Sequence, residues 1–129
     1  MHHWKMFIAS SSKGLRYAEA IKSVIEAHFK PQVCHLWNQR TFPPGSSFLE
    51  SLEQIRSKYN CGLAVFTADD QLGDLFAPRD NVVLEFGLFL GAFGRERSFL
   101  LVEGRKDLKI PSDYLLSVAK PASYCSLMT

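Results

Sequence analysis

The feature that most constrains the fold is an uninterrupted uncharged run over residues 61–67, near the middle of the chain. Its sequence, Cys-Gly-Leu-Ala-Val-Phe-Thr, lacks the alternation of apolar and polar residues found in a strand with one face in water. A run of this length and composition is typical of a strand buried on both faces of a parallel sheet. We therefore predict that residues 61–67 form the central strand.

Segments of strand length alternate with segments of helical periodicity along the rest of the chain. The expected strands are residues 4–9, 32–37, 61–67, 98–102 and 118–124, and the expected helices are residues 15–29, 46–59 and 78–94. Residues 68–77 and 103–113 are polar and are expected to be loops. This order predicts an α/β fold, a doubly wound, mostly parallel five-stranded sheet with helices on both faces. With 129 residues, the chain fits one domain.

Composition excludes several classes of function. The net charge is +2 and no basic run occurs, so we do not expect nucleic acid as a partner. No apolar run reaches the roughly 20 residues of a membrane span, and the N-terminus lacks the order of a signal peptide. We expect no membrane association and a cytoplasmic location.

Cysteine and histidine residues do not form a recognisable framework. Cys34, Cys61 and Cys125 are odd in number, widely spaced and set in apolar surroundings. That pattern favours reduced structural thiols over disulfides. The histidines are not spaced as ligands with them, so no metal site is predicted.

One carboxylate stands out in the segment 77–97, which is predicted to be a single helix. Pro78 cannot continue a preceding helix, Asp80 or Asn81 can cap the first free N–H groups, and Gly94 suits the C-terminal end. Between these ends Glu85 is the only charged residue, and apolar side chains surround it on all sides of the helix. Two interpretations stay open here. Either the helix dipole stabilises Glu85 as it points outward, or Glu85 lines a pocket and takes part in chemistry.

The sheet architecture selects the loops that would surround such a pocket. Ligands bind beyond the carboxyl ends of parallel strands, where the strand order reverses. The selected loops are residues 10–14, 37–45 and 68–81. Ser10, Ser11 and Ser12 offer hydroxyl and N–H groups that suit a phosphate or an amide, although no phosphate-binding glycine motif is present. Trp37 and Phe42 could stack on a flat ring, but aromatic residues at strand ends more often belong to the core.

Several blocks along nearly the whole chain resemble one protein family. They are Phe-Ile-Ala-Ser-Ser-Ser at 7–12, Leu-Trp-Asn-Gln at 36–39 with Phe42, Pro-Gly-Ser-Ser at 44–47, Ala-Pro-Arg-Asp-Asn-Val-Val-Leu-Glu-Phe-Gly at 77–87, Gly-Arg-Glu-Arg at 94–97 and Ile-Pro-Ser-Asp at 110–113. These blocks resemble the bacterial TIR-like predicted nucleotide-binding domains. Within this family, the sequence resembles most the TIR domain that is fused to bacterial STING in cyclic-oligonucleotide anti-phage defence.

The resemblance implies a flavodoxin-like TIR fold and hydrolysis of NAD+ to nicotinamide and ADP-ribose species. NAD+ is then the substrate, and no cofactor or metal is implied. Glu85 matches the catalytic glutamate of the family. The expected substrate-binding residues are Ser10, Ser11, Trp37, Phe42, Asp69, Arg79, Asp80 and Asn81. The resemblance also implies activation by self-association through TIR surfaces and a fused cyclic-dinucleotide sensor domain.

The domain prediction is a single TIR domain over residues 1–129. The chain ends soon after the expected last strand without an obvious closing helix, which is compatible with a domain excised from a longer protein. Two other functions remain as alternatives. One is a non-catalytic TIR interaction and assembly module, because the same fold serves both purposes. The other is an enzyme of the nucleoside deoxyribosyltransferase type, in which a glutamate on a comparable helix acts as a nucleophile.

Overall fold

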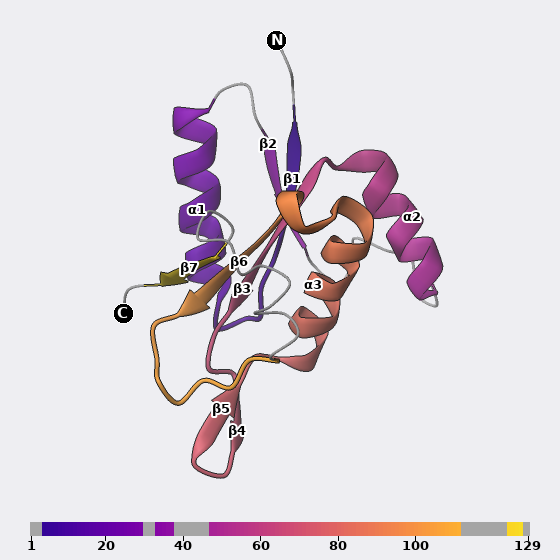
Figure 1. Cartoon of the computed structure of the whole chain (residues 1–129). Coiled ribbons are helices and arrows are strands. Elements are labelled where there is room, and N and C mark those ends of the chain that lie inside the picture. The colour runs from indigo at the N-terminus through magenta and orange to yellow at the C-terminus, as the bar shows by residue number, and fades with distance from the viewer. Residues whose placement is uncertain (1–3, 30–32, 38–46, 112–123, 128–129) are drawn as a thin grey trace.

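A computed structural model of the chain describes residues 4–29, 33–37, 47–111 and 124–127 (Figure 1). The helices are α1 (Leu15–His28), α2 (Phe48–Lys58), α3 (Asp80–Phe93) and a short 3-10 turn η1 (Arg95–Arg97). The strands are β1 (Lys5–Ala9), β2 (Val33–Leu36), β3 (Cys61–Phe66), β4 (Asp70–Leu72), β5 (Leu75–Ala77), β6 (Ser98–Glu103) and β7 (Tyr124–Leu127).

Five of the strands form one sheet in the order β2-β1-β3-β6-β7. Every neighbouring pair in this sheet is parallel. Counted along the chain, this order is that of a flavodoxin-like doubly wound sheet. The predicted fold class is therefore confirmed. The expected strand 118–124 shares only Tyr124 with β7, and its other residues lie outside the described part of the chain.

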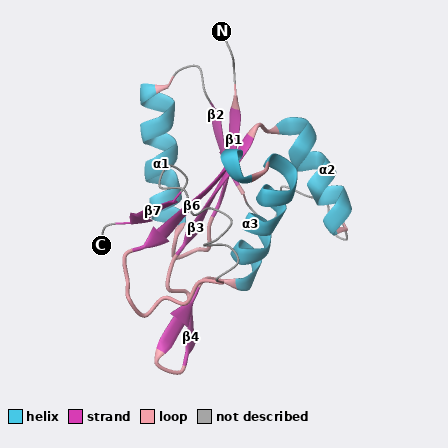
Figure 2. Ribbon diagram, in the orientation of Figure 1, coloured by secondary structure: helices cyan, strands magenta, loops and turns pink. Residues whose placement is uncertain are grey.

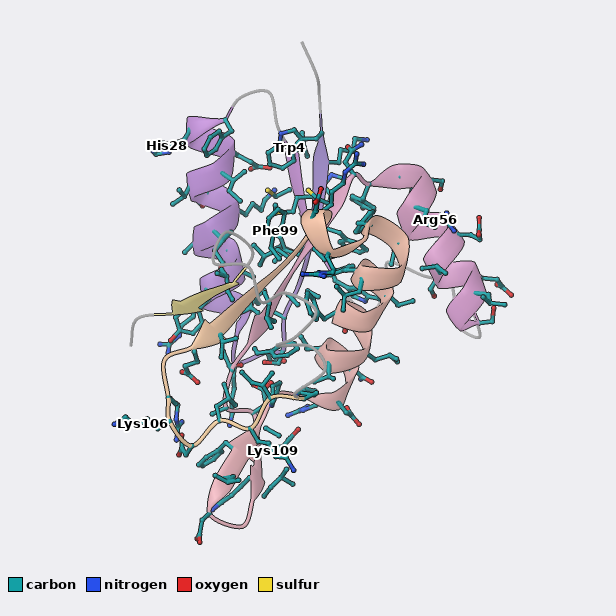
Figure 3. The ribbon with its side chains drawn as sticks, in the orientation of Figure 1. Trp4, His28, Arg56, Phe99, Lys106 and Lys109 are labelled. Atoms are coloured by element: carbon teal, nitrogen blue, oxygen red, sulfur yellow. The ribbon has the colours of Figure 1, made fainter. Side chains whose placement is uncertain are left out.

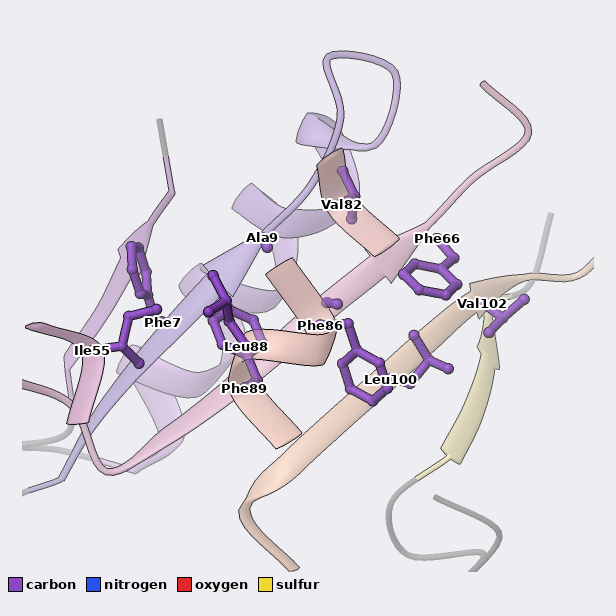
Figure 4. Close-up of a cluster of buried hydrophobic side chains, with 11 residues drawn as sticks. Phe7, Ala9, Ile55, Phe66, Val82, Phe86, Leu88, Phe89, Leu100 and Val102 are labelled. Atoms are coloured by element: carbon purple, nitrogen blue, oxygen red, sulfur yellow. The ribbon is translucent and has the colours of Figure 1, made fainter. Parts of the chain in front are cut away.

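The helices cover the sheet on both faces, with α1 on one side and α2 and α3 on the other (Figure 2). The α1 side is packed with Met6, Ile8, Ala18, Cys34, Cys61, Leu63 and Val65. The opposite side is packed with Phe7, Ala9, Ile55, Ala64, Phe66, Val82, Phe86, Leu88, Phe89, Leu100 and Val102 (Figure 4). Among the described helices, none is both long enough and apolar enough to cross a membrane.

Strand β3 is the centre of the sheet, as its uncharged sequence predicts. All six of its residues are buried, between β1 and β6. Gly62 lets α3 approach closely, because a Cβ there would lie only 2.5–2.8 Å from three ring carbons of Phe89. The absence of a side chain at this position therefore fixes how near α3 lies to the sheet.

The helix ends follow the sequence in two of three cases. Ser47 caps α2, since its Oγ accepts the N–H of Glu50 at 3.1 Å. Gly94 ends α3 with a φ of 78°, in the left-handed region that favours glycine. The expected cap at Asp80 or Asn81 is confirmed in part: the N-cap residue is Arg79, which makes no side-chain cap, but the carboxylate of Asp80 accepts the N–H of Asn81 at 2.7 Å.

Residues 70–77, expected to be a loop, form the antiparallel β4–β5 hairpin that projects beyond the sheet in Figure 1. Its turn contains Gly73 with a φ of 60°. Phe76 ties the hairpin to the segment after β6, because its N–H donates to Asp107 at 2.8 Å and its carbonyl accepts the N–H of Lys109 at 2.7 Å. Lys109 accordingly lies beside the hairpin in Figure 3. The hairpin leads directly into α3 and helps to hold its start.

We predict that Gly62→Ala destabilises the protein by roughly 1–3 kcal/mol, because the new methyl group overlaps the ring of Phe89. Gly91→Ala is the control. A Cβ at Gly91 would meet only Cδ1 of Leu52, at 3.6 Å, so this change should stabilise α3 by up to about 1 kcal/mol. Urea unfolding compares the variants, and equal midpoints for the two would contradict the close approach of α3 at Gly62.

Candidate active site

The strand order reverses between β1 and β3. The chain leaves β1 through α1 toward β2, and it leaves β3 through α3 toward β6, on opposite faces of the sheet. In sheets of this kind, the crevice at the carboxyl ends of two such strands is the usual ligand site. Residues 10–14 and 67–69 follow these two strands directly, and residues 78–81 begin α3.

Asp69 is the centre of a hydrogen-bond network at this edge of the sheet, where the crevice is expected. Its Oδ1 accepts the hydroxyl of Ser11 at 2.6 Å and the hydroxyl of Thr67 at 2.7 Å. Its Oδ2 accepts the backbone N–H of Arg79 at 2.7 Å. Asp69 is only 7% exposed. The structure therefore brings Ser11 and Asp69 together, as predicted, but they bond to each other and to the start of α3.

The first residues of α3 lie at the surface of the same crevice. The Arg79 guanidinium donates to the carboxylate of Asp70 at 3.0 Å, and both side chains are about half exposed. The carboxylate of Asp80 accepts the N–H of Asn81 at 2.7 Å. Arg79, Asp80 and Asn81 are all exposed, so a ligand in the crevice can reach them.

Glu85 lies one turn further along α3, where it is half-buried and has buried residues near it on the helix. Val82 is three positions before it, and Leu88 and Phe89 are three and four positions after it, so all share one stripe of the helix. Figure 4 shows these three residues on the helix side that packs on the sheet. Within the described part of the chain, Oε2 of Glu85 is buried without a hydrogen-bond partner. Burial raises the pKa of Glu85 from 4.5 to about 8, since a carboxylate loses its hydration there.

Strands β1 and β3 carry short side chains on the face that packs against α3. Phe89 packs over Gly62, and Glu85 precedes Phe89 by about 6 Å along α3. Ala64 follows Gly62 by about 7 Å along β3 in the same direction, because α3 runs back from the carboxyl edge of the sheet. Ala64 pairs in register with Ala9, and both are fully buried. On the other side Ala64 pairs in register with Leu100, which is also fully buried, so the short side chains at this level are those of β1 and β3.

Trp37 occupies the position of a core aromatic residue. Its indole stacks on Phe7 with ring centroids 4.7 Å apart and an interplanar angle of 12°, and it lies 6.0 Å from the ring of Phe89. It remains partly exposed at the end of β2. Ser10 is half-buried directly after β1, and Phe42 lies outside the described residues.

Sequence reasoning missed three residues of this region. Thr67 bonds to Asp69 directly, and the Lys13 ammonium donates to the Asp69 carbonyl at 3.2 Å. Glu103, at the end of β6, accepts the N–H of Ala68 at 2.9 Å. Thr67 and Glu103 lie at the carboxyl ends of the neighbouring strands β3 and β6, and this position could have indicated that they belong to the region. Nothing local in the sequence indicates their partners.

Cys34 and Cys61 are not suited to act as nucleophiles. Cys34 and Cys61 are free and buried. Burial raises the pKa of Cys61 to about 12 and raises that of Cys34, so both remain thiols at neutral pH. No group of three or more His, Cys, Asp or Glu side chains among the described residues is arranged to hold a metal ion.

Comparison with known proteins gives one family. Residues 5–119 match the family described as CAP12/Pycsar effector protein, TIR domain. A CD-NTase-associated protein 12 from Lachnospiraceae bacterium (strain RUG226) is 40% identical over 115 residues, covering 86% of this chain and 35% of that protein. The CD-NTase-associated protein 12 of Flavobacterium daejeonense is 38% identical, covering 91% of this chain and 37% of that protein. The Pycsar effector protein PaPycTIR of Pseudomonas aeruginosa is 37% identical, with 84% and 36% covered. The chain thus spans about a third of the length of these relatives.

The buried carboxyl of Glu85 predicts a pH-dependent stability. Because its pKa is raised to about 8 on folding, the folded chain holds a proton that the unfolded chain releases above 4.5. Ionisation of Glu85 therefore lowers stability as the pH rises from 4.5, and the full loss is reached above 8. Glu85→Gln cannot ionise and should raise the Tm by on the order of 5 °C at about pH 8.5, with little change at about pH 5. Thermal melts check this, with the exposed Glu53→Gln as control. Equal melts of parent and Glu85→Gln at both pH values would contradict the burial.

Proposed function

The chain belongs to the TIR domain family of CAP12 and Pycsar effector proteins, and on this premise we propose that it is an NAD+ glycohydrolase. The reaction cleaves the bond between nicotinamide and ribose and releases nicotinamide and ADP-ribose species. The observation that carries the proposal is Glu85, whose carboxyl oxygen is buried without a partner beside the crevice at the carboxyl edge of the sheet. An interaction module would gain nothing from such a costly group.

The chemistry of NAD+ suits a site with one carboxylate. The leaving pyridinium departs as neutral nicotinamide, so no general acid is required. The demand falls on the ribose, which develops positive charge as an oxocarbenium-like species. A carboxylate between apolar walls interacts with that charge more strongly than it would in water. In this proposal Glu85 binds the hydroxyls of the nicotinamide ribose and stabilises the developing charge.

The raised pKa of Glu85 fits a binding site for a cation. Without substrate, Glu85 is mostly protonated at neutral pH, because its pKa is about 8. The positively charged nicotinamide ring next to Glu85 would favour the carboxylate form, which is the form needed for catalysis. Substrate binding is thus expected to be coupled to release of the Glu85 proton.

The remaining crevice residues would orient the dinucleotide. Arg79, Asp80 and Asn81 are exposed at the start of α3, where they can meet phosphate or ribose groups. Ser10 and the exposed part of Trp37 border the other side of the crevice. Ser11 and Asp69 would act through the network that they form with each other.

We place this activity in an effector of anti-phage signalling. The relatives are named as CD-NTase-associated and Pycsar effector proteins, and each is about three times as long as the aligned segment. A sensor of a cyclic nucleotide, fused to the TIR domain as in the STING-linked version, would supply the signal. This context makes uncontrolled cleavage of NAD+ harmful to the host, so the isolated domain should have low activity.

Glu85→Gln should lower nicotinamide release by roughly a hundredfold or more, because the side chain keeps its shape but cannot carry the negative charge. For the parent, kcat/KM should rise about tenfold per pH unit toward pH 8 and then level off. Chromatography of nicotinamide at high protein concentration measures both effects. Glu53→Gln, an exposed glutamate on α2, is the control. Parent-like activity in Glu85→Gln would refute the catalytic assignment.

Activity should rise faster than linearly with protein concentration, or increase when the domain is fused to an oligomerising partner. Exposed leucines on α2 and α3, Leu49 and Leu84, are 70% and 51% exposed and are available to a neighbouring copy. The loop 38–45, including Phe42, from which the sequence predicts such contacts, lies outside the described residues. A partner that binds only the competent form raises its population in proportion to its differential affinity. Constant specific activity over a wide dilution range, with no response to forced clustering, would show that the monomer is already competent.

A further inference from the structure

Asp69 connects the starts of two helices that lie on opposite faces of the sheet. Toward α3, its Oδ2 accepts the N–H of Arg79, the N-cap residue, at 2.7 Å. Toward α1, its Oδ1 accepts the hydroxyl of Ser11 at 2.6 Å. The same Ser11 oxygen accepts the N–H of Gly14, the N-cap residue of α1, at 3.2 Å. One carboxylate therefore holds both helix starts.

Neither helix is capped by its own N-cap residue, although in α3 the carboxylate of Asp80 accepts the N–H of Asn81 at 2.7 Å. The N-cap residues Gly14 and Arg79 both lack a side-chain cap hydrogen bond. The first N–H groups of a helix need acceptors, and its positive dipole end favours a negative charge. Asp69 supplies the acceptor and the charge for α3 directly and for α1 through Ser11. Its bonds are charge-assisted and therefore stronger than the neutral bonds of an ordinary cap.

The position of the Asp69 carboxylate is fixed from several sides. Thr67 donates its hydroxyl to Oδ1 at 2.7 Å, and the Asp69 N–H donates to Ala77 at 3.1 Å. The preceding residue, Ala68, is held by Glu103 at 2.9 Å. A group fixed in this way can transmit its position to the elements that bind it.

We propose that Asp69 is the positioning residue that sets the distance between the β1–α1 turn and the start of α3, and thereby the place of Glu85. This inference rests on the proposed function for its catalytic consequence. Glu85 follows Arg79 by about 9 Å along a continuous helix, so a shift at the start of α3 moves the carboxylate with it. Asp69 acts through Arg79 and Ser11 and does not itself contact the reacting atoms.

Asp70 provides a matched control within the same chain. It is the next residue and contacts the same partner, but it bonds to the Arg79 guanidinium at 3.0 Å and leaves the Arg79 N–H untouched. Both side chains are about half exposed, and surface ion pairs contribute little stability. Asp70→Asn therefore removes an equal charge near α3 without disturbing the start of the helix.

The test compares Asp69→Asn, Ser11→Ala and Asp70→Asn with the parent, at a temperature well below every Tm. Asp69→Asn should lower kcat for nicotinamide release roughly tenfold or more, with a smaller change in KM, because Glu85 is misplaced in the bound complex. Hydrogen exchange should accelerate at residues 14–18 and 79–84 together. For Asp70→Asn, kcat should stay within about twofold of the parent value, and the hydrogen-exchange rates should be unchanged.

Ser11→Ala is the milder variant, and it keeps the proposal testable if Asp69→Asn does not fold. Ser11→Ala should accelerate hydrogen exchange mainly at residues 14–18. When Ser11→Ala is added to Asp69→Asn, it should lower kcat little further, since both changes break the same hydrogen bond. The proposal would be overturned if Asp69→Asn lowered only the Tm, or if its kcat and hydrogen exchange matched those of Asp70→Asn. If the parent releases no nicotinamide, the proposed function fails, and the exchange at the two helix starts still decides whether Asp69 positions them.

Discussion

The burial of a single carboxylate is the constraint on which the account of this site depends. Glu85 lies on an apolar helix that packs against the sheet, and its Oε2 atom is buried. Removing a carboxylate from water costs several kcal/mol unless it is paired or protonated. The described residues offer Oε2 no partner, and the pKa rises to about 8. In the proposed function, this environment suits Glu85 to a positively charged ligand.

Two carboxylates at the same edge of the sheet have opposite surroundings. Asp69 receives hydrogen bonds from Ser11, Thr67 and Arg79, so its binding capacity is used within the protein. Glu85 has an oxygen without such a partner. Different environments are the usual way in which one site assigns different tasks to similar groups. Here one carboxylate is suited to holding the scaffold and the other to meeting the substrate.

The sequence predicted the sheet and its helices because local patterns determine them. The run 61–67 has no charge to place in water. Ser47 caps the start of α2 with its hydroxyl, and Gly94 ends α3 with a positive φ. The β4–β5 hairpin was missed, although Gly73-Asp74 between Leu72 and Leu75 is a recognised turn signal. The partners of Asp69 were not predictable, because Ser11 approaches it only after β1 and β3 pair in register, and Arg79 only after β4 pairs with β5. Trp37 follows the same logic, since its stacking on Phe7 depends on the pairing of β1 with β2.

The protonation state of Glu85 in the free protein tests the central claim most directly. The side-chain carboxyl carbon of a glutamate reports its own ionisation in a carbon-13 NMR titration, and Glu85→Gln identifies the signal. The account predicts a titration midpoint at about 8, well above the ordinary value of 4.5, because burial disfavours the charged form. A midpoint at about 4.5 would mean that water reaches the carboxylate freely, and it would contradict a buried carboxyl held ready for a cationic substrate.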